Sequence, residues 1–134
     1  MFDEAAETMP RDELHALQST RLETLARYVY QRVPFYKDAF DAAGVDPASV
    51  RSIDDITSLP ITRKSDLHAN YPTGLFAVPT DKLARIHASS GTTGKPTIVG
   101  YTANDLELFA QVNARCLAAA GATPGMVFHN AYGY

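Results

Sequence analysis

Nine consecutive residues carry the chemistry of this chain: Ser89-Ser90-Gly91-Thr92-Thr93-Gly94-Lys95-Pro96-Thr97. They include two glycines, five hydroxyl side chains and one lysine, and no large apolar side chain. Such a stretch adds nothing to a hydrophobic core, but its backbone N–H groups, hydroxyls and ammonium can all donate hydrogen bonds. Glycine also lets the backbone approach a ligand closely. A concave loop of donors suits a chain of phosphates, so we interpret this stretch as a phosphate-binding loop.

The segments on both sides of the loop have the character of short strands. Residues 83–88 precede it, and alternation places Ala84, Ile86 and Ala88 on one side of that strand. Residues 97–101 follow the loop and form the second candidate. Strand, loop and strand together predict a hairpin-like arrangement.

A long helix is expected directly after the second strand. Thr102 suits the N-cap, and Asp105 three residues later suits a capping box. Gly121 is a natural residue to end the helix. We expect this helix to be mostly buried, with Cys116 as a core thiol and Asn113 in need of a hydrogen-bond partner. Its predicted apolar face consists of Leu106, Phe109, Ala110, Leu117 and Ala120.

Residues 126–134 are expected to form a third strand that runs into an aromatic and glycine-containing segment. A natural domain seldom ends inside a strand with no partner to pair it. No second strand–helix–strand set is visible that would close a sheet. We therefore expect the chain to be the front part of something longer.

Residues 1–78 are predicted to form several helices joined by proline turns. The first long helix starts near Pro10 and ends at about Val33, because Pro34 disfavours the helical conformation just before it. Its apolar stripe contains Leu14, Leu17, Leu22, Leu25, Tyr28 and Val29, and Gln18, Arg21 and Arg32 project into the same sector. Two interpretations stay open. The helix is half-buried with arginines that extend into solvent, or it contacts a second domain or subunit.

Three shorter helical segments are expected after the first helix. The first covers 35–43 and is stopped by Gly44, and the second, helical or 3₁₀, ends at Pro60. The third covers roughly 63–69, with Thr62 as its N-cap and Ser65 or Asp66 answering from its first turn. We see no catalytic constellation in these helices.

Composition and charge exclude several functional classes. The chain has 134 residues, of which 46% are hydrophobic, and a formal net charge of −3, which disfavours a general nucleic-acid or anionic-membrane binder. It contains no apolar run long enough for a membrane span, and its acidic N-terminus is not a secretory signal. One cysteine cannot form an internal disulfide, so a reducing, cytoplasmic location fits best. The four histidines show no metal-ligand spacing, and no metal site is predicted from protein residues.

Two familiar phosphate loops fail a position-by-position test. A Walker A loop needs a glycine where Ser89 stands and a Ser or Thr where Pro96 stands. A dinucleotide fingerprint fails at Ser89 as well. A nucleic-acid-clamping GxxG loop is disfavoured by the acidic charge balance and the strand flanks. A merely flexible Gly/Ser/Thr loop remains the structural alternative from composition alone.

The order of residues is more specific than their composition. The string 86–97, followed by Gly100-Tyr101-Thr102, resembles the phosphate loop of adenylate-forming enzymes, and within them the phenylacetate-CoA ligase family. The resemblance extends over nearly the whole chain after about residue 10. Other matching segments are Asp12-Glu13-Leu14, Val33-Pro34-Phe35-Tyr36, Phe40-Asp41-Ala42-Ala43-Gly44, Leu59-Pro60, Tyr71-Pro72 and Ala131-Tyr132-Gly133-Tyr134.

This resemblance implies a ligase that uses ATP, Mg²⁺ and coenzyme A. The carboxylate of an aryl acid would attack the α-phosphate of ATP, and the coenzyme A thiol would then displace AMP. In the family the loop grips the β,γ-phosphates. The residues implied here are Ser89, Ser90, Gly91, Thr92, Thr93, Gly94 and Lys95, with Lys95 in the catalytic role. Pre-placed donors of this kind stabilise developing charge in phosphoryl chemistry.

The resemblance also implies a fold and a second group of residues. The fold class expected is α/β: a helical subdomain over 1–78, then the first strands and helix of the adenylate-forming core over 79–134. Tyr132, Gly133 and Tyr134 resemble the aromatic motif beside the acyl pocket, although ordinary sheet tyrosines are an equal alternative. The resemblance further points to a homodimer through the helical region.

Length is where the chain departs from the family pattern. Enzymes of this family are about three times longer, so we expect the chain alone to be incomplete and inactive. Two alternatives stay open for the function. One is an adenylate-forming enzyme for another aryl acid or acceptor, and the other is a non-catalytic dimerisation module with a vestigial loop.

Overall fold

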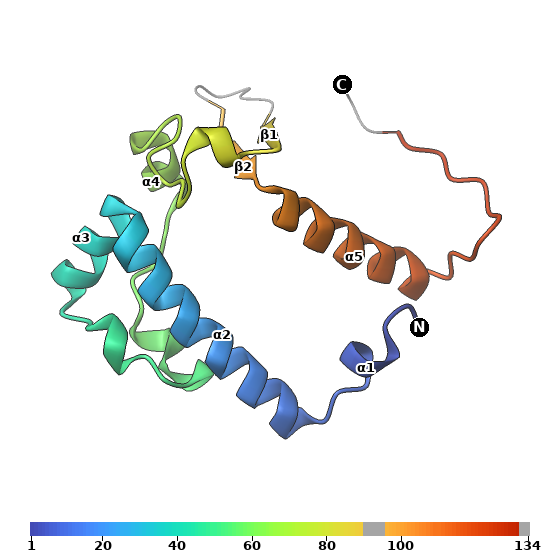
Figure 1. Ribbon diagram of the computed structural model, residues 1–134, viewed down its shortest axis with the longest axis horizontal. Coiled ribbons are helices and arrows are strands. Elements are labelled where there is room, and N and C mark those ends of the chain that lie inside the picture. The colour runs from blue at the N-terminus through green and yellow to red at the C-terminus, as the bar shows by residue number, and fades with distance from the viewer. Residues whose placement is uncertain (90–95, 132–134) are drawn as a thin grey trace.

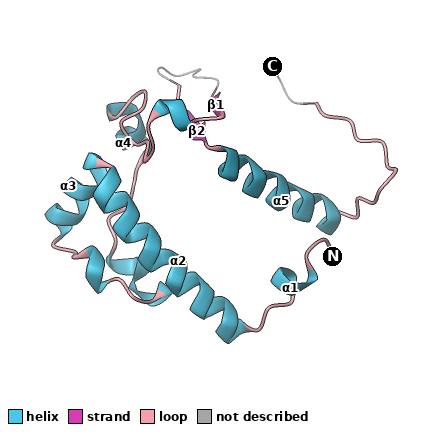
Figure 2. Cartoon of the chain, viewed as in Figure 1, coloured by secondary structure: helices cyan, strands magenta, loops and turns pink. Residues whose placement is uncertain are grey.

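The computed structural model describes residues 1–89 and 96–131, and this part of the chain is mostly helical with one two-stranded sheet (Figures 1 and 2). In chain order the elements are α1 (Glu4–Glu7), α2 (Arg11–Arg32), α3 (Pro34–Ala43), η1 (Pro47–Ser49), η2 (Ile53–Ser58), α4 (Lys64–Ala69), η3 (Thr80–Lys82), β1 (Arg85–Ala88), β2 (Ile98–Tyr101) and α5 (Ala103–Ala119). The segments that follow α2 gather along it, whereas α5 lies apart from them (Figure 1). None of the helices in the described ranges is both long and apolar enough to cross a membrane.

Prolines set both ends of α2, as the sequence predicts. Pro10 is its N-cap, and the acidic Asp12 and Glu13 lie in the first turn, where they complement the helix dipole. The helix ends at Arg32, and Val33 adopts an extended conformation with φ −122° and ψ 107°. This is the conformation that a residue before proline prefers, and Pro34 then occupies the first turn of α3.

A small hydrophobic core forms where α2, α3 and the segment around η1 meet. Its buried members are Ala26, Phe40 and Val50, and the Phe40 ring packs edge-on against Tyr30 with centroids 6.0 Å apart. The predicted stripe of α2 is only partly buried, because Leu25 keeps 54% of its surface exposed and Tyr28 keeps 39%. The core is therefore narrow.

The end of α3 follows the predicted glycine stop. Gly44 has φ +67° and ψ 26°, the left-handed conformation that glycine adopts without a side-chain clash. The N–H of Val45 then donates to the Phe40 carbonyl at 3.0 Å, which satisfies one of the last helical acceptors.

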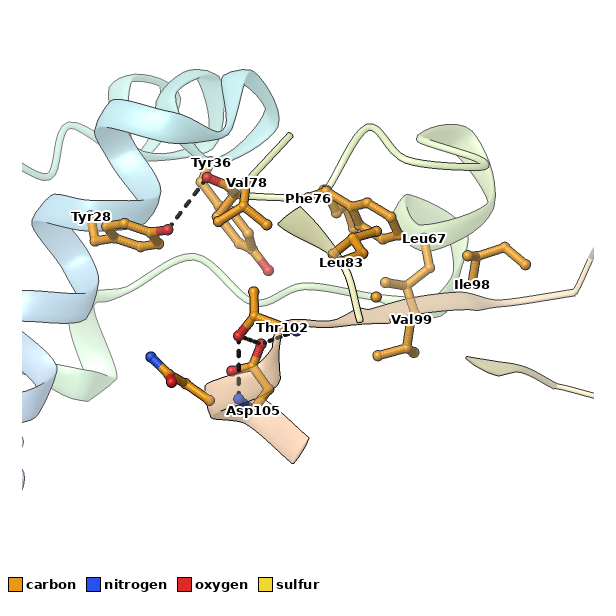
Figure 3. A pocket seen from close by; sticks show the side chains of 14 residues that line it. Tyr28, Tyr36, Leu67, Phe76, Val78, Leu83, Ile98, Val99, Thr102 and Asp105 are labelled. Carbon is orange, nitrogen blue, oxygen red and sulfur yellow. Dashed lines mark hydrogen bonds between the residues drawn. The ribbon is translucent and has the colours of Figure 1, made fainter. Parts of the chain in front are cut away.

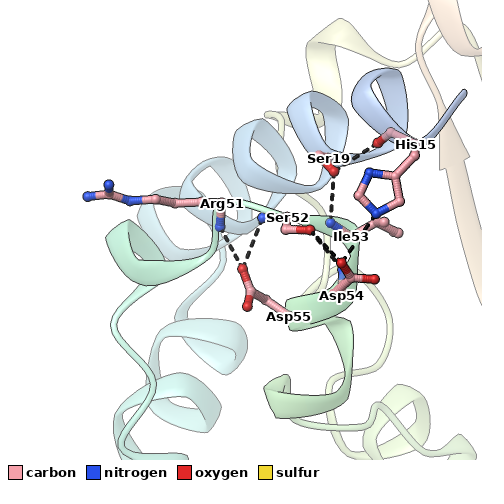
Figure 4. Close-up of polar contacts among 7 residues, drawn as sticks. All are labelled: His15, Ser19, Arg51, Ser52, Ile53, Asp54 and Asp55. Atoms are coloured by element: carbon pink, nitrogen blue, oxygen red, sulfur yellow. Dashed lines mark hydrogen bonds and ion pairs between the residues drawn. The ribbon is translucent and has the colours of Figure 1, made fainter. Parts of the chain in front are cut away.

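Polar contacts attach η2 to α2 (Figure 4). Ser19 on α2 donates from Oγ to the carbonyl of His15 at 2.8 Å and accepts from the N–H of Ile53 at 3.0 Å. The carboxylate of Asp55 accepts from the N–H groups of Arg51 and Ser52, both at 2.9 Å. These contacts close the first turn of the 3₁₀ helix that the sequence predicts over residues 53–59.

The N-cap predicted for α4 is wrong by one residue. The cap is Arg63, whose N–H donates to the Asp66 carboxylate at 2.7 Å, so the answering acid is the expected one. Thr62 lies outside the helix and donates from its hydroxyl to the Tyr36 hydroxyl at 3.1 Å. Thr62 therefore makes a tertiary contact with Tyr36 on α3 instead of capping α4.

The capping prediction for α5 is confirmed, but the predicted burial is wrong. Thr102 Oγ1 accepts from the N–H of Asp105, and the Asp105 carboxylate accepts from the N–H of Thr102. Leu106 is half-buried, but Phe109 and Leu117 farther along the predicted face are exposed, and Cys116 is an exposed thiol rather than a core residue. Asn113 is also exposed and satisfies itself by donating to the carbonyl of Phe109 at 2.8 Å. Among the described residues, α5 contacts β2 at its start, and near its end Arg115 lies 3.7 Å from the Glu7 carboxylate of α1.

The third predicted strand does not form in residues 126–131, which have no regular structure. Met126, Val127 and Phe128 are largely exposed. A strand needs a neighbour to pair its backbone groups, and the described chain places none beside this segment. The prediction of a strand in this segment is therefore wrong.

Candidate functional site

The hairpin of β1 and β2 carries the predicted phosphate loop. The two strands are antiparallel, and their register places Arg85 opposite Tyr101 and Ala88 opposite Ile98. The hairpin that the sequence predicts is thus confirmed. β1 begins two residues later than expected and β2 one residue later, and both end where predicted. The loop ends, Ser89 and Thr97, meet directly beyond the last strand pair.

Two hydrogen bonds close the base of the loop. The N–H of Ser89 donates to the carbonyl of Thr97 at 3.0 Å. The N–H of Thr97 donates to the side-chain Oγ of Ser89 at 2.9 Å. Of the predicted phosphate-binding residues, Ser89 is therefore described, whereas Ser90, Gly91, Thr92, Thr93, Gly94 and Lys95 lie outside the described residues. Tyr132, Gly133 and Tyr134, predicted beside an acyl pocket, also lie outside them.

Aromatic contacts join one face of the hairpin to α5. The ring centroids of His87 and Tyr101 are 4.8 Å apart, and those of Tyr101 and Phe109 are 5.9 Å apart. Because β2 ends at Tyr101 and the next residue, Thr102, caps α5, the strand connects the end of the loop directly to the start of the helix. His87 and Tyr101 belong to the stretch that resembles the adenylate-forming enzymes, but their contact with each other was not predicted, although the alternation of the two strands places both on one face.

A cleft of about 500 Å³ lies on the other side of β2 (Figure 3). Its walls come from α2, α3, α4, β2 and the start of α5, and from residues 70–84 between α4 and β1, which we call the linker. Figure 3 shows Tyr28 and Tyr36 at one end, and Leu67 and Ile98 at the other. Its volume is within the range of small-molecule sites, and its lining is mostly apolar.

Polar groups in the cleft are already engaged in structural contacts. Tyr28 donates from its hydroxyl to the carbonyl of Ala77 at 3.4 Å, and the Tyr36 hydroxyl accepts from Thr62. The Asp105 carboxylate serves the cap of α5. The walls of this cleft come from segments that are distant in the chain, so no local sequence pattern predicts it.

Gly100 allows the linker to pack tightly on β2. A methyl group in place of its hydrogen would lie 3.0 Å from the side chain of Leu83 and 3.1 Å from the ring of Phe76. These distances are shorter than ordinary contacts, so the missing side chain sets how closely linker and strand approach.

The resolved pKa shifts lie in the helical region and at the N-terminus. Lys37, which donates to the Asp41 carboxylate at 2.6 Å, lowers the pKa of Asp41, and Tyr30 lowers it further. The same contact raises the pKa of Lys37. The backbone N–H of Asp3 lowers the pKa of Glu7, and Arg115 lowers it further. These exposed groups stabilise local structure, and none of them lies at the hairpin.

No metal centre is evident in the described residues. No group of three or more His, Cys, Asp or Glu side chains within 1–89 and 96–131 is placed to hold a metal ion. His15 Nε2 instead lies 3.3 Å from the Asp54 carboxylate (Figure 4), and the ring of His87 packs against Tyr101.

Comparison with solved structures defines the class of the protein. No family model matches the chain. A crystal structure of 2-hydroxyisobutyryl-CoA ligase in complex with 2-HIB-AMP and CoA matches 88% of this chain and 26% of that one, with a TM-score of 0.79 and 32% identity. The same ligase in its postadenylation state with 2-HIB-AMP gives a TM-score of 0.77 and 30% identity. The fold is that of the N-terminal part of adenylate-forming CoA ligases.

Curated relatives show which of these ligases the chain resembles in sequence. Phenylacetate-coenzyme A ligase of Thermus thermophilus is 60% identical over 134 residues, and that of Escherichia coli is 52% identical over 128 residues. The chain is thus a homologue of the phenylacetate-coenzyme A ligases along its whole length, which confirms the resemblance noted in the sequence. It spans 30% of the Thermus thermophilus protein and 29% of the Escherichia coli protein.

Proposed function

We propose that the whole protein is an acid–thiol ligase that joins phenylacetate, or a similar aryl acid, to coenzyme A at the expense of ATP. The observation that carries this proposal is the 60% identity to a phenylacetate-coenzyme A ligase over a stretch that contains the loop of residues 89–97. The solved neighbours support the same chemistry, because they hold an acyl-AMP and CoA.

The proposed reaction has two steps. The substrate carboxylate attacks the α-phosphorus of ATP, which forms the acyl-adenylate and releases pyrophosphate. The thiol of coenzyme A then attacks the acyl carbon, loses its proton and displaces AMP. Activation is needed because a free carboxylate repels nucleophiles and has no good leaving group, whereas AMP is one.

The loop would act on the first step by holding the leaving pyrophosphate. Lys95, with the N–H and hydroxyl groups of its neighbours, would face the β,γ-phosphates and stabilise the charge that develops on them. The hairpin supports this role because it fixes both loop ends on paired strands. Mg²⁺ is expected with the nucleotide, but the described residues supply no ligand cluster for it, and no step is derived through it.

Lys95→Ala in the whole protein tests this role. We expect kcat/KM for pyrophosphate release with ATP and phenylacetate to fall about 100-fold, the typical loss when one charge-stabilising donor is removed. Lys82→Ala removes an exposed lysine from η3 and is the matched control, expected to keep full activity. Unchanged turnover in Lys95→Ala would contradict the role of the loop.

Substrate range separates the alternatives. An enzyme for aryl acids should form the thioester faster with phenylacetate than with 2-hydroxyisobutyrate, the acid in the solved neighbours, and the reverse order would favour the second acid. No pyrophosphate release with either acid would favour a non-catalytic module. We expect the 134-residue chain by itself to be inactive, since it spans about 30% of its relatives.

We also propose that the exposed side of α2 forms a homodimer contact. Leu25 and Tyr28 are exposed there, and the Arg32 guanidinium lies 5.8 Å from the centre of the Tyr28 ring. Exposed aromatic and arginine side chains are enriched in protein interfaces. A monomer in sedimentation of the whole protein at micromolar concentration would contradict this contact.

A further inference from the structure

The base of the loop departs from an ordinary strand ladder at one residue. One more step of the β1–β2 register pairs Ser89 with Thr97. In a regular hydrogen-bonded pair, the two residues exchange backbone N–H and carbonyl groups. Here the Ser89 N–H donates to the Thr97 carbonyl, whereas the Thr97 N–H donates to the hydroxyl of Ser89 at 2.9 Å.

The hydroxyl thereby takes the place of a backbone acceptor. A serine hydroxyl can accept from one group while its own proton donates to another. The side chain of Ser89 is therefore committed, through its oxygen, to the other end of the loop. Alanine or glycine at residue 89 would keep the strands but lose this second bond.

We infer that Ser89 is a positioning residue, which acts by holding the Thr97 end of the loop rather than mainly as a direct phosphate ligand. This inference rests on the proposed function of the loop. By holding the Thr97 N–H, the Ser89 hydroxyl fixes the spacing of the loop ends before ATP binds. Nucleotide binding then loses less conformational entropy at the loop ends, because their spacing is already fixed in the free protein.

We call the hydrogen bond between the Thr97 N–H and the Ser89 hydroxyl the clamp. It can be measured directly, without an enzyme assay. In the whole protein, amide exchange at Thr97 measured by NMR should accelerate about tenfold in Ser89→Ala, because the N–H loses its acceptor. Ser89→Thr keeps the hydroxyl and should exchange like the parent. The amide of Val45, bonded in the helical region, is the internal reference. Equal exchange at Thr97 in the parent and Ser89→Ala would overturn the clamp.

Kinetics of the whole protein test whether the clamp matters for function. Ser89→Ala should raise KM for ATP about fivefold, the value of one exposed hydrogen bond, and leave kcat nearly unchanged. A residue that held phosphate in the transition state would lower kcat instead. A fall in kcat with KM for ATP unchanged would overturn the inference.

The decisive measurement is the coupling between the two loop ends. Thr97→Pro removes the N–H donor and leaves Ser89 intact, while Thr97→Val keeps the N–H and is the control. In the Thr97→Pro background, Ser89→Ala should raise KM by less than half the fold-change that it causes in the parent. A larger effect would mean that Ser89 acts without Thr97 and would overturn the inference. Failure of the proposed function is distinguishable, because the parent would then show no ATP-dependent turnover while Thr97 exchange still reported the clamp.

Discussion

The helical region of α2, α3 and η2 and the hairpin region of β1, β2 and α5 use their apolar side chains differently. The first packs Ala26, Phe40 and Val50 into a core of its own. In the second, Leu108 and Phe109 on α5 keep 60% and 45% of their surface exposed. Each region has a helix with a clear local end signal, since Gly44 ends α3 and Thr102 with Asp105 caps α5, so local signals do not separate them. The difference shows that helix formation and helix burial are independent outcomes.

The physical reason lies in the connections. Short proline-bounded turns after α2 return the chain to the same helix, so α3 and η2 lie on α2. No described element covers the exposed face of α5, and α1 lies beside this helix only near its end (Figure 1). An amphipathic helix gains most of its stability from packing, so the two regions should respond differently to the same substitution.

Phe40→Ala should have the largest effect on stability. It removes a ring that is 3% exposed from a core with few members, and the free energy of unfolding of the 134-residue chain should fall by about 3–5 kcal/mol. Urea unfolding followed by circular dichroism measures this loss.

Phe109→Ala is the matched control from the other region. Its ring is 45% exposed, so the free energy of unfolding should change by less than about 1 kcal/mol. Similar losses in the two variants would mean that α5 is as well covered as α3, and the comparison of the two regions would fail.

Gly100→Ala should have an intermediate effect, because it adds a methyl group 3.0 Å from Leu83 and 3.1 Å from Phe76. Overpacking of this kind costs about 1–3 kcal/mol, which thermal unfolding of the hairpin region would show. Leu83→Ala in the same chain makes room, so the double variant should lose less than the sum of the two single losses. Strict additivity would show that this contact does not limit the approach of linker and strand.

Asp55 should give the smallest effect, a modest loss of stability at neutral pH that disappears in acid. The N–H groups of Arg51 and Ser52 lower its pKa below the ordinary 3.8. A carboxyl group with a lowered folded-state pKa stabilises the fold above its unfolded pKa, and this contribution is lost as the pH falls through the folded value. Asp55→Asn should therefore flatten the loss of thermal stability below about pH 4.

Ser58→Ala lies in the same 3₁₀ helix, removes no charge and should keep the acid profile of the parent. Melting temperatures at pH 7 and pH 3 give the comparison. Parallel profiles for the parent and Asp55→Asn would show that this carboxylate does not hold η2 against acid.

The features that depend on neighbouring residues could be predicted from the sequence alone. Pro34 ends α2, Gly44 ends α3, and Thr102 with Asp105 begins α5, because each acts through backbone geometry or a hydrogen bond within one turn. The hairpin was also predictable, since two short β-prone segments flank a loop that contains no core residue. The order of residues in that loop indicated the family to which the chain proved similar.

Which apolar faces are covered, and which side chain closes the loop, depends instead on contacts between segments that are distant in the chain. The exposure of Cys116, the missing strand in residues 126–131 and the cleft beside β2 all depend on partners distant in the chain. The bond between Thr97 and the Ser89 hydroxyl depends on the strand register, which brings residues eight apart together. Burial and pairing are properties of two surfaces, so the pattern of one segment cannot specify them.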